Sequence, residues 1–277
     1  MPDQNSMRQA IQSVICAMMD RALDKVLVQD PFIPDCHHAK APLYAALVPD
    51  EIFKGSHFER RFVTPFGTAW EQLALVAAKH GAGHGEAGRQ ISGTVKAERL
   101  RRITEVLNDL EHGGRGAERQ RPNWAAELDY VLKGHGQDIP VTVVCDVYVE
   151  DRSAGMKYAF ELKAPLPNSD QTKVSKEKIL KLYSMHPRQV DDAYYALPYN
   201  PYGKREDYKW SFPARWFDMQ ADPVVLIGNE FWDKIGGEGT YESFIAAVNE
   251  IGPEYKRRIY KEYLGMVPPP GAEEMKL

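Results

Sequence analysis

Three residues whose side chains could bind a metal ion and activate water fall on two neighbouring stretches of β-type sequence. Asp146 lies in the valine-rich residues 140–149, and Glu161 and Lys163 lie in residues 156–163. Because side chains alternate between the two faces of a strand, Glu161 and Lys163 share one face. Paired carboxylates are oxygen ligands of the kind that Mg²⁺ prefers. The three residues therefore predict a site where a hydrated cation lies beside an ammonium group.

The short polar connection between the two stretches predicts a β-hairpin. Residues 151–155 end in glycine, as tight turns often do. We assume that Asp151 pairs with Met156. In that antiparallel register Asp146 faces Glu161, with Cβ atoms about 5 Å apart. A divalent cation would relieve the repulsion between two such charges. The alternative is a solvated polar face, and a register shift of one residue would change the facing pair.

Together these side chains predict a Mg²⁺-dependent phosphodiesterase site. A bound metal ion lowers the pKa of a water ligand and offsets the charge of a phosphorane-like transition state. The ammonium group of Lys163 would stabilise the resulting hydroxide and orient it for in-line attack. Asp146 and Glu161 would hold the metal ion.

The residues around this site resemble a known nuclease motif. Cys145-Asp146 with Phe160-Glu161-Leu162-Lys163 is similar to the PD-(D/E)XK motif, with cysteine in place of the motif's proline. The longer stretches 158–178 and 188–195 resemble the TdeIII-like type II restriction endonucleases. The resemblance covers roughly the C-terminal half of the chain. It implies the α/β restriction-endonuclease-like fold, in which helices flank a central mixed sheet.

The same resemblance implies an activity and its partners. It implies Mg²⁺-dependent, sequence-specific cleavage of double-stranded DNA at a short, interrupted, G/C-rich palindrome, leaving a 5′-phosphate and a 3′-hydroxyl. A two-fold symmetric DNA site is matched by a two-fold symmetric protein, so we expect a homodimer. A cognate DNA methyltransferase would protect the cell's own sites. The alternatives are a structure-specific repair or junction nuclease of the same fold and a non-catalytic DNA-binding protein.

Glu71 is a further candidate for the metal site. The sequence predicts a turn at residues 64–68 and a helix at residues 69–79. In nucleases that this chain resembles, an acid from an early helix often joins the metal ligands or supports them. The alternative is structural, because Thr68 and Glu71 also fit a capping box at a helix N-terminus.

The sequence that follows the site is locally basic. Residues 162–190 hold six basic and two acidic residues, a net charge of +4. Lys173, Lys176 and Arg188 are candidates for contacts with DNA phosphates. Arg188 and Gln189 could also read purine edges, since arginine suits guanine and glutamine suits adenine. A solvated helix face is the alternative interpretation.

Elsewhere the hydrophobic pattern predicts helices around a small set of strands. The predicted helices are residues 7–27, 96–110, 173–185, 188–196, 241–251 and 255–263, with a loop at 33–42 and a buried strand at 224–227. We interpret residues 1–277 as a single nuclease domain. Its residues 1–135 are mainly helical, with a role in dimerisation or DNA wrapping. Residues 136–265 form the catalytic core, and residues 266–277 form a tail.

Bulk composition narrows the class of protein. The chain has 277 residues, a net charge of −4 and a pI of about 6.1. These values argue against a wholly basic nucleic-acid binder but allow a locally basic surface. The three cysteines are odd in number and far apart, which fits a reducing compartment. Without a signal peptide or an apolar run of about 18 residues, the chain is expected in the cytoplasm with no membrane partner.

Overall fold

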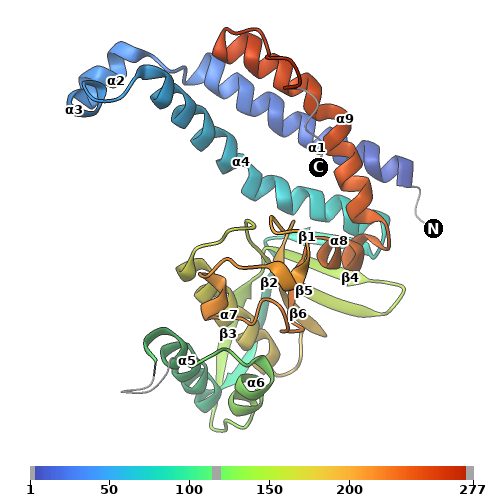
Figure 1. The fold of residues 1–277 in the computed structure, drawn as a ribbon. Coiled ribbons are helices and arrows are strands. Elements are labelled where there is room, and N and C mark those ends of the chain that lie inside the picture. The colour runs from blue at the N-terminus through green and yellow to red at the C-terminus, as the bar shows by residue number, and fades with distance from the viewer. Residues whose placement is uncertain (1–3, 114–119, 273–277) are drawn as a thin grey trace. The chain divides into compact units, whose positions relative to one another are not determined.

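The computed structural model describes residues 4–113 and 120–272 and divides the chain into two compact units (Figure 1). One unit, the helical unit, takes the chain up to Leu73 and again from Glu242 onward. The other, the sheet unit, is Ala74–Tyr241. The single domain expected from the sequence stays a prediction, and the end of the expected tail, residues 273–277, lies outside the described residues.

The helical unit is built on three long helices, α1 (Gln4–Asp24), α4 (Asp50–His80) and α9 (Thr240–Arg258). The first continues as one wide turn, η1 (Lys25–Gln29), and the last as η4 (Ile259–Leu264). Buried residues recur along α1 at helical spacing, at Met7, Ile11, Ile15 and Met18. The predicted helix at 7–27 is therefore confirmed. Helix α1 lies beside α9, where the Tyr255 hydroxyl donates to Asp20 at 3.0 Å (Figure 1).

Prolines mislead the sequence prediction in this unit. The loop expected at 33–42 is two short helices, α2 (Pro34–Lys40) and α3 (Pro42–Ala45). Each begins on a proline, where the missing N–H costs no helical hydrogen bond. The turn expected at 64–68 is also wrong, because α4 runs through Pro65. Pro253 likewise lies inside α9, so the two expected closing helices are one.

The sheet unit is centred on a five-stranded mixed sheet in the order β1-β4-β5-β6-β7. Its strands are β1 (Gly83–Ala87), β4 (Val147–Asp151), β5 (Met156–Leu162), β6 (Asp192–Leu197) and β7 (Val225–Ile227). The β1–β4 and β4–β5 pairs are antiparallel, whereas β5–β6 and β6–β7 are parallel. A separate two-stranded antiparallel sheet pairs β2 (Gln90–Lys96) with β3 (Asp138–Val144). The expected α/β architecture with a mixed sheet is confirmed.

Helices cover both faces of the five-stranded sheet. On one face lies α7 (Ser169–Ser184), which α5 (Ala97–His112) and α6 (Trp124–Leu132) contact in turn. The buried side chains of α7 pack in one core with strand residues such as Tyr148 and Tyr195. On the other face the ring of Phe160 meets that of Phe231 from α8 (Asn229–Gly236) at 5.5 Å. No helix of the described residues is long and apolar enough to cross a membrane.

Residues 188–196 are not the helix that their pattern predicts. The segment enters β6, whose residues after Asp192 are all buried. A parallel strand with both faces covered is a nearly continuous apolar run, so it lacks the alternation that marks a half-exposed strand. The predicted helices at 96–110 and 173–185 are confirmed as α5 and α7, and the predicted strand at 224–227 is confirmed as β7.

Candidate active site

A break between two strands positions Asp146. Residues 140–149 were expected to form a single strand, but β3 ends at Val144 in one sheet and β4 begins at Val147 in the other. Backbone hydrogen bonds hold the residues at the break. Cys145 donates to the carbonyl of Arg89, and the carbonyl of Asp146 accepts from Gly88, both at 3.1 Å. The change of sheet therefore fixes the backbone from which the Asp146 carboxylate projects.

The register of the predicted hairpin is confirmed. Asp151 pairs with Met156, and the ladder continues to the pair of Val147 and Phe160. Asp146 lies one residue beyond that last pair, and its N–H still donates to the carbonyl of Phe160 at 3.1 Å. The turn between the strands is therefore enough to bring Asp146 to the end of β5, where Glu161 lies.

The structure brings Asp146, Glu161 and Lys163 together. The ammonium of Lys163 is 2.5 Å from Asp146 Oδ2 and 3.5 Å from Glu161 Oε2, so it bridges the two carboxylates. The backbone N–H of Leu162 donates to the same Asp146 oxygen at 2.8 Å. Two acids and a base thus meet in the way that the strand pattern predicts.

Burial sets the electrostatics of these groups. The side chain of Glu161 is 1% exposed, against 22% for Asp146 and 18% for Lys163. Burial, and then the charge of Asp146, raises the pKa of Glu161 to about 6, although lysines nearby oppose the shift. Burial by itself would lower the pKa of Lys163, but the two carboxylates outweigh it and the pKa is raised. Positive charge is therefore stabilised between the carboxylates.

Sequence reasoning missed two residues that reach the site from α7. The ammonium of Lys178 lies 2.9 Å and 3.0 Å from the two oxygens of Glu161. The hydroxyl of Ser175 donates to Glu161 Oε2 at 3.4 Å. Ser175 and Lys178 are three residues apart on a predicted helix, so the sequence shows that they share a face. Only the packing of α7 on the sheet shows which residue that face meets.

Comparison with known proteins decides the family. Residues 7–252 match the family described as the type II restriction endonuclease HinfI. The chain belongs to this family. It is a type II restriction enzyme, a site-specific deoxyribonuclease that acts on DNA. The restriction-endonuclease expectation is confirmed, although the family is HinfI where the sequence resemblance pointed to TdeIII-like enzymes. The non-catalytic alternative is wrong.

Three related type II restriction enzymes come from Herpetosiphon aurantiacus. HgiEI is 28% identical over 257 residues, which cover 87% of this chain and 89% of the relative. HgiBI is 29% identical over 224 residues, covering 76% and 77% of the two chains. HgiCII is 28% identical over 233 residues, covering 80% and 81%. The similarity therefore extends well beyond the C-terminal half from which the resemblance was drawn.

The residues predicted to touch DNA have different environments in this HinfI-family endonuclease. Lys176 is fully buried, and its ammonium contacts Glu127 at 2.5 Å and the carbonyl of Trp216. It cannot reach a phosphate in this structure, so the charge count misjudged this residue. Lys173 is half-buried and lies 2.5 Å from Glu111. The basic stretch is thus partly structural.

Arg188 and Gln189 lie in the loop before β6 rather than on a helix. The side chain of Arg188 is 55% exposed, lies over the ring of Tyr183 and donates to the carbonyl of Val190 at 3.0 Å. Gln189 is half-buried and donates to the carbonyl of Pro187. Both side chains are held by their own loop, which limits the orientations that they present.

Glu71 does not begin a helix in this endonuclease. It lies inside α4, so Thr68 is no N-cap, and the capping box given as the alternative interpretation does not form. Glu71 belongs to the helical unit, whereas the three residues that meet at the β4–β5 hairpin belong to the sheet unit.

The side chains of the site suit a hard cation. Asp146 and Glu161 supply carboxylate oxygens, and Mg²⁺ typically takes one or two protein carboxylates and completes its shell with water and phosphate. Among the described residues, no three or more His, Cys, Asp and Glu side chains gather as a metal cluster. The bridging ammonium of Lys163 indicates that the two acids stabilise positive charge between them.

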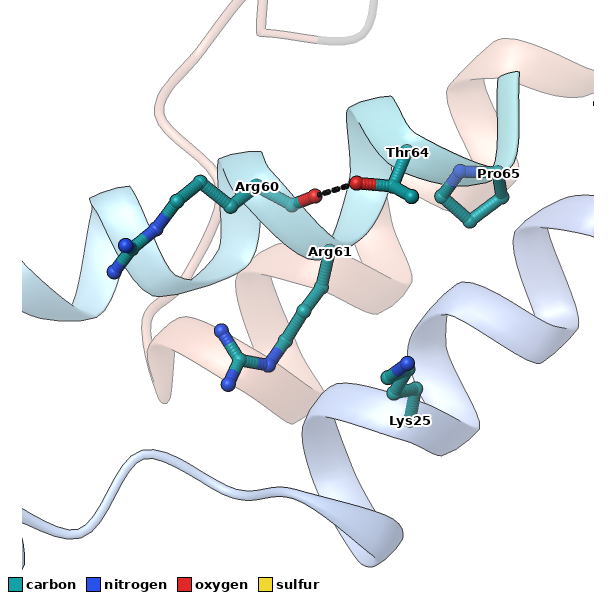
Figure 2. A pocket seen from close by; sticks show the side chains of 5 residues that line it. All are labelled: Lys25, Arg60, Arg61, Thr64 and Pro65. Carbon is teal, nitrogen blue, oxygen red and sulfur yellow. Dashed lines mark hydrogen bonds between the residues drawn. The ribbon is translucent and has the colours of Figure 1, made fainter. Parts of the chain in front are cut away.

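A surface pocket in the helical unit has different chemistry. Figure 2 shows its lining of Lys25, Arg60, Arg61, Thr64 and Pro65. The pocket has a volume of about 270 Å³. Two donors of Arg61 bind the carboxylate of Asp30, a residue outside the lining. The lining carries no carboxylate and three cationic side chains, so this pocket does not suit a metal cation.

Proposed function

We propose that this endonuclease hydrolyses the phosphodiester backbone at Asp146, Glu161 and Lys163 with Mg²⁺, on a PD-(D/E)XK fold. The observation that carries the proposal is the Lys163 ammonium bridging two carboxylates at the β4–β5 hairpin. Further support comes from the mixed sheet and from the confirmed register that brings the two acids together.

The side chains of the proposed site have different roles in hydrolysis. When bound, Mg²⁺ would supply a water of lowered pKa and offset the charge that develops on the phosphate. Asp146 and Glu161 would hold the cation through their carboxylate oxygens. Lys163 stabilises the attacking hydroxide and orients it in line with the leaving oxygen. Cleavage leaves a 5′-phosphate and a 3′-hydroxyl.

The substrate is a short palindrome in double-stranded DNA, which we propose to be interrupted and rich in G and C. A homodimer reads it, because a two-fold symmetric sequence is matched by two copies of one surface. Lys173 contacts phosphate, while Arg188 and Gln189 read base edges from the loop before β6. A cognate DNA methyltransferase protects the host's own sites.

The experiment compares plasmid cleavage by the wild-type enzyme, Lys163→Ala and Lys157→Ala, with Mg²⁺ or with EDTA. Lys157 is the control because it is an exposed lysine on the same strand. We expect discrete fragments from the wild type and from Lys157→Ala in Mg²⁺, and none from Lys163→Ala or in EDTA. Sequencing of the fragment ends then gives the target.

Two results would contradict the proposal. Unchanged fragments from Lys163→Ala would remove this residue from the site. Cleavage at DNA junctions or flaps without a defined fragment pattern would favour a structure-specific nuclease of the same fold.

A further inference from the structure

Lys178 makes a closer contact with the buried carboxylate of Glu161 than Lys163 does. Its ammonium lies 2.9 Å from Oε1 and 3.0 Å from Oε2, so it contacts both oxygens. Lys163 reaches only Oε2, at 3.5 Å. Because Glu161 is 1% exposed, water cannot replace these partners. The orientation of this carboxylate therefore depends more on Lys178 than on Lys163.

The four charged groups form a continuous chain from Asp146 through Lys163 and Glu161 to Lys178. Two carboxylates are balanced by two ammonium groups, which lets the charges coexist in a largely buried place. Lys163 is shared between the two acids, whereas Lys178 pairs with Glu161. The two lysines are thus not equivalent.

Helix α7 holds Lys178 at a fixed place on the sheet. Its N-terminus is capped by Asn168, whose side chain accepts from the backbone N–H of Gln171 at 2.8 Å. The hydroxyl of Thr172 lies 3.1 Å from that of Tyr195 on β6. The buried Lys176 anchors the side of the helix that faces Glu127 on α6. The backbone that carries Lys178 is therefore tied to its surroundings on several sides.

We propose that Lys178 is a positioning residue of the active site, which holds the Glu161 carboxylate, through both of its oxygens, in the orientation that cleavage requires. The inference rests on the proposed function, because Lys178 has this role only if Glu161 serves cleavage. Lys178 acts through Glu161 and does not contact DNA phosphate.

The test compares Lys178→Met and Lys178→Arg with Lys181→Met. Methionine keeps the apolar stem and removes the charge, and arginine restores a two-point donor. Lys181 is the control because it lies on the same helix and pairs with Glu177 instead. At saturating Mg²⁺ and DNA, we expect Lys178→Met to lower the single-turnover rate by about 10–100-fold, as the loss of an outer-shell partner does. Lys178→Arg recovers part of that rate, and Lys181→Met cleaves like the wild type.

Two readouts separate positioning from other roles. In EDTA, the affinity of Lys178→Met for target DNA should keep the wild-type salt dependence. A slope reduced by about 1 would indicate a lost phosphate contact and would overturn the proposal. Thermal unfolding in EDTA provides the second readout. Introducing Lys178→Met should lower the Tm of the wild type. It should not lower the Tm of Glu161→Gln, because the carboxamide at position 161 carries no charge for Lys178 to pair with.

A double-mutant cycle on cleavage completes the test. Adding Lys178→Met to Glu161→Gln should not lower the residual rate further. A Lys178→Met enzyme that is less stable but cleaves at the wild-type rate overturns the inference and leaves Lys178 as a structural partner. Wild-type cleavage by Glu161→Gln would instead overturn the proposed active site itself, so the two failures are distinguishable.

Discussion

The two carboxylates of the proposed site are built into the protein differently. Asp146 keeps 22% of its side chain exposed and accepts a backbone hydrogen bond from Leu162. Glu161 is 1% exposed and depends on two lysines for its charge. Burial favours the neutral acid and the ammonium groups favour the carboxylate, and the balance raises the pKa of Glu161 to about 6. Asp146 is therefore the acid that can be altered with the smaller effect on folding.

We predict that Asp146→Asn abolishes cleavage and leaves the protein folded. Asparagine keeps an oxygen that can accept from Leu162, but it lacks the charge that holds a cation. The cleavage rate in Mg²⁺ should fall by more than about 100-fold, beyond the 10–100-fold typical of an outer-shell partner. The measurement is single-turnover cleavage beside circular dichroism of the variant. Substantial cutting by a folded Asp146→Asn would remove this residue from the site.

Glu98 provides a pH dependence that is separate from catalysis. It lies in the first turn of α5, and the backbone N–H of His135, followed by Arg102, lowers its pKa from 4.5 to about 2. A carboxyl whose pKa is depressed by folding stabilises the protein above its unfolded pKa and loses that contribution as pH falls. The difference in Tm between the wild type and Glu98→Gln should be full above pH 4.5 and shrink toward pH 2. A difference that is constant over this range would contradict the assignment.

At the level of secondary structure, the lysines of α7 lie in two different environments. Ser175 and Lys178 face Glu161 at the site, whereas Lys176 is buried against α6. Burial lowers the pKa of Lys176, and the nearby charge of Glu127 opposes that shift. Neighbouring lysines on one helix therefore have unrelated roles, which the helical period separates.

We predict that Lys176→Met destabilises the protein by about 3–5 kcal/mol, the typical cost of leaving one partner of a buried pair uncompensated. Glu127 is 5% exposed, so water cannot take over the lost contact. The double variant Lys176→Met with Glu127→Met should recover much of this loss, because no unpaired charge remains. Denaturant unfolding of the single and double variants measures both. Equal stability of the wild type and Lys176→Met would contradict the burial of this ion pair.

At the scale of the whole molecule, the net charge of −4 leaves DNA binding to local surfaces. Several basic side chains of residues 162–190 are paired within the protein, among them Lys173 with Glu111 and Lys178 with Glu161. A single chain therefore presents less free positive charge near the site than its sequence suggests. Two copies on one palindrome would double the contacts available.

We predict that two chains bind one duplex that carries the target sequence. Multi-angle light scattering of the complex, in Ca²⁺ or with the Lys163→Ala variant that we expect to be inactive, should give the mass of two chains and one duplex. A palindrome offers two equivalent half-sites, and a two-fold dimer matches both at once. A complex of one chain per duplex at all protein concentrations would contradict the dimer. Duplex with a scrambled sequence is the control.

The features that can be predicted from the sequence depend on residues that lie close together along the chain. The juxtaposition of Asp146 with Glu161 and Lys163 depends on a five-residue connection and on strand alternation, both of which act over short distances along the chain. Helices α1, α5 and α7 follow from apolar periodicity for the same reason. Prolines at 34, 42 and 65 misled the prediction because they are accepted in first turns and, in a long packed helix, even inside it.

The remaining features depend on contacts between elements that are distant in the sequence. Residues 140–149 belong to two sheets because β2 and β5 each take one half of the segment as a partner. Residues 188–196 enter a strand because β5 and β7 lie on either side of it. Lys176 is buried and Lys178 reaches Glu161 because α7 docks in one orientation on the sheet. Each of these depends on contacts between residues far apart in the chain, and a count of charges or a local period carries no information about them.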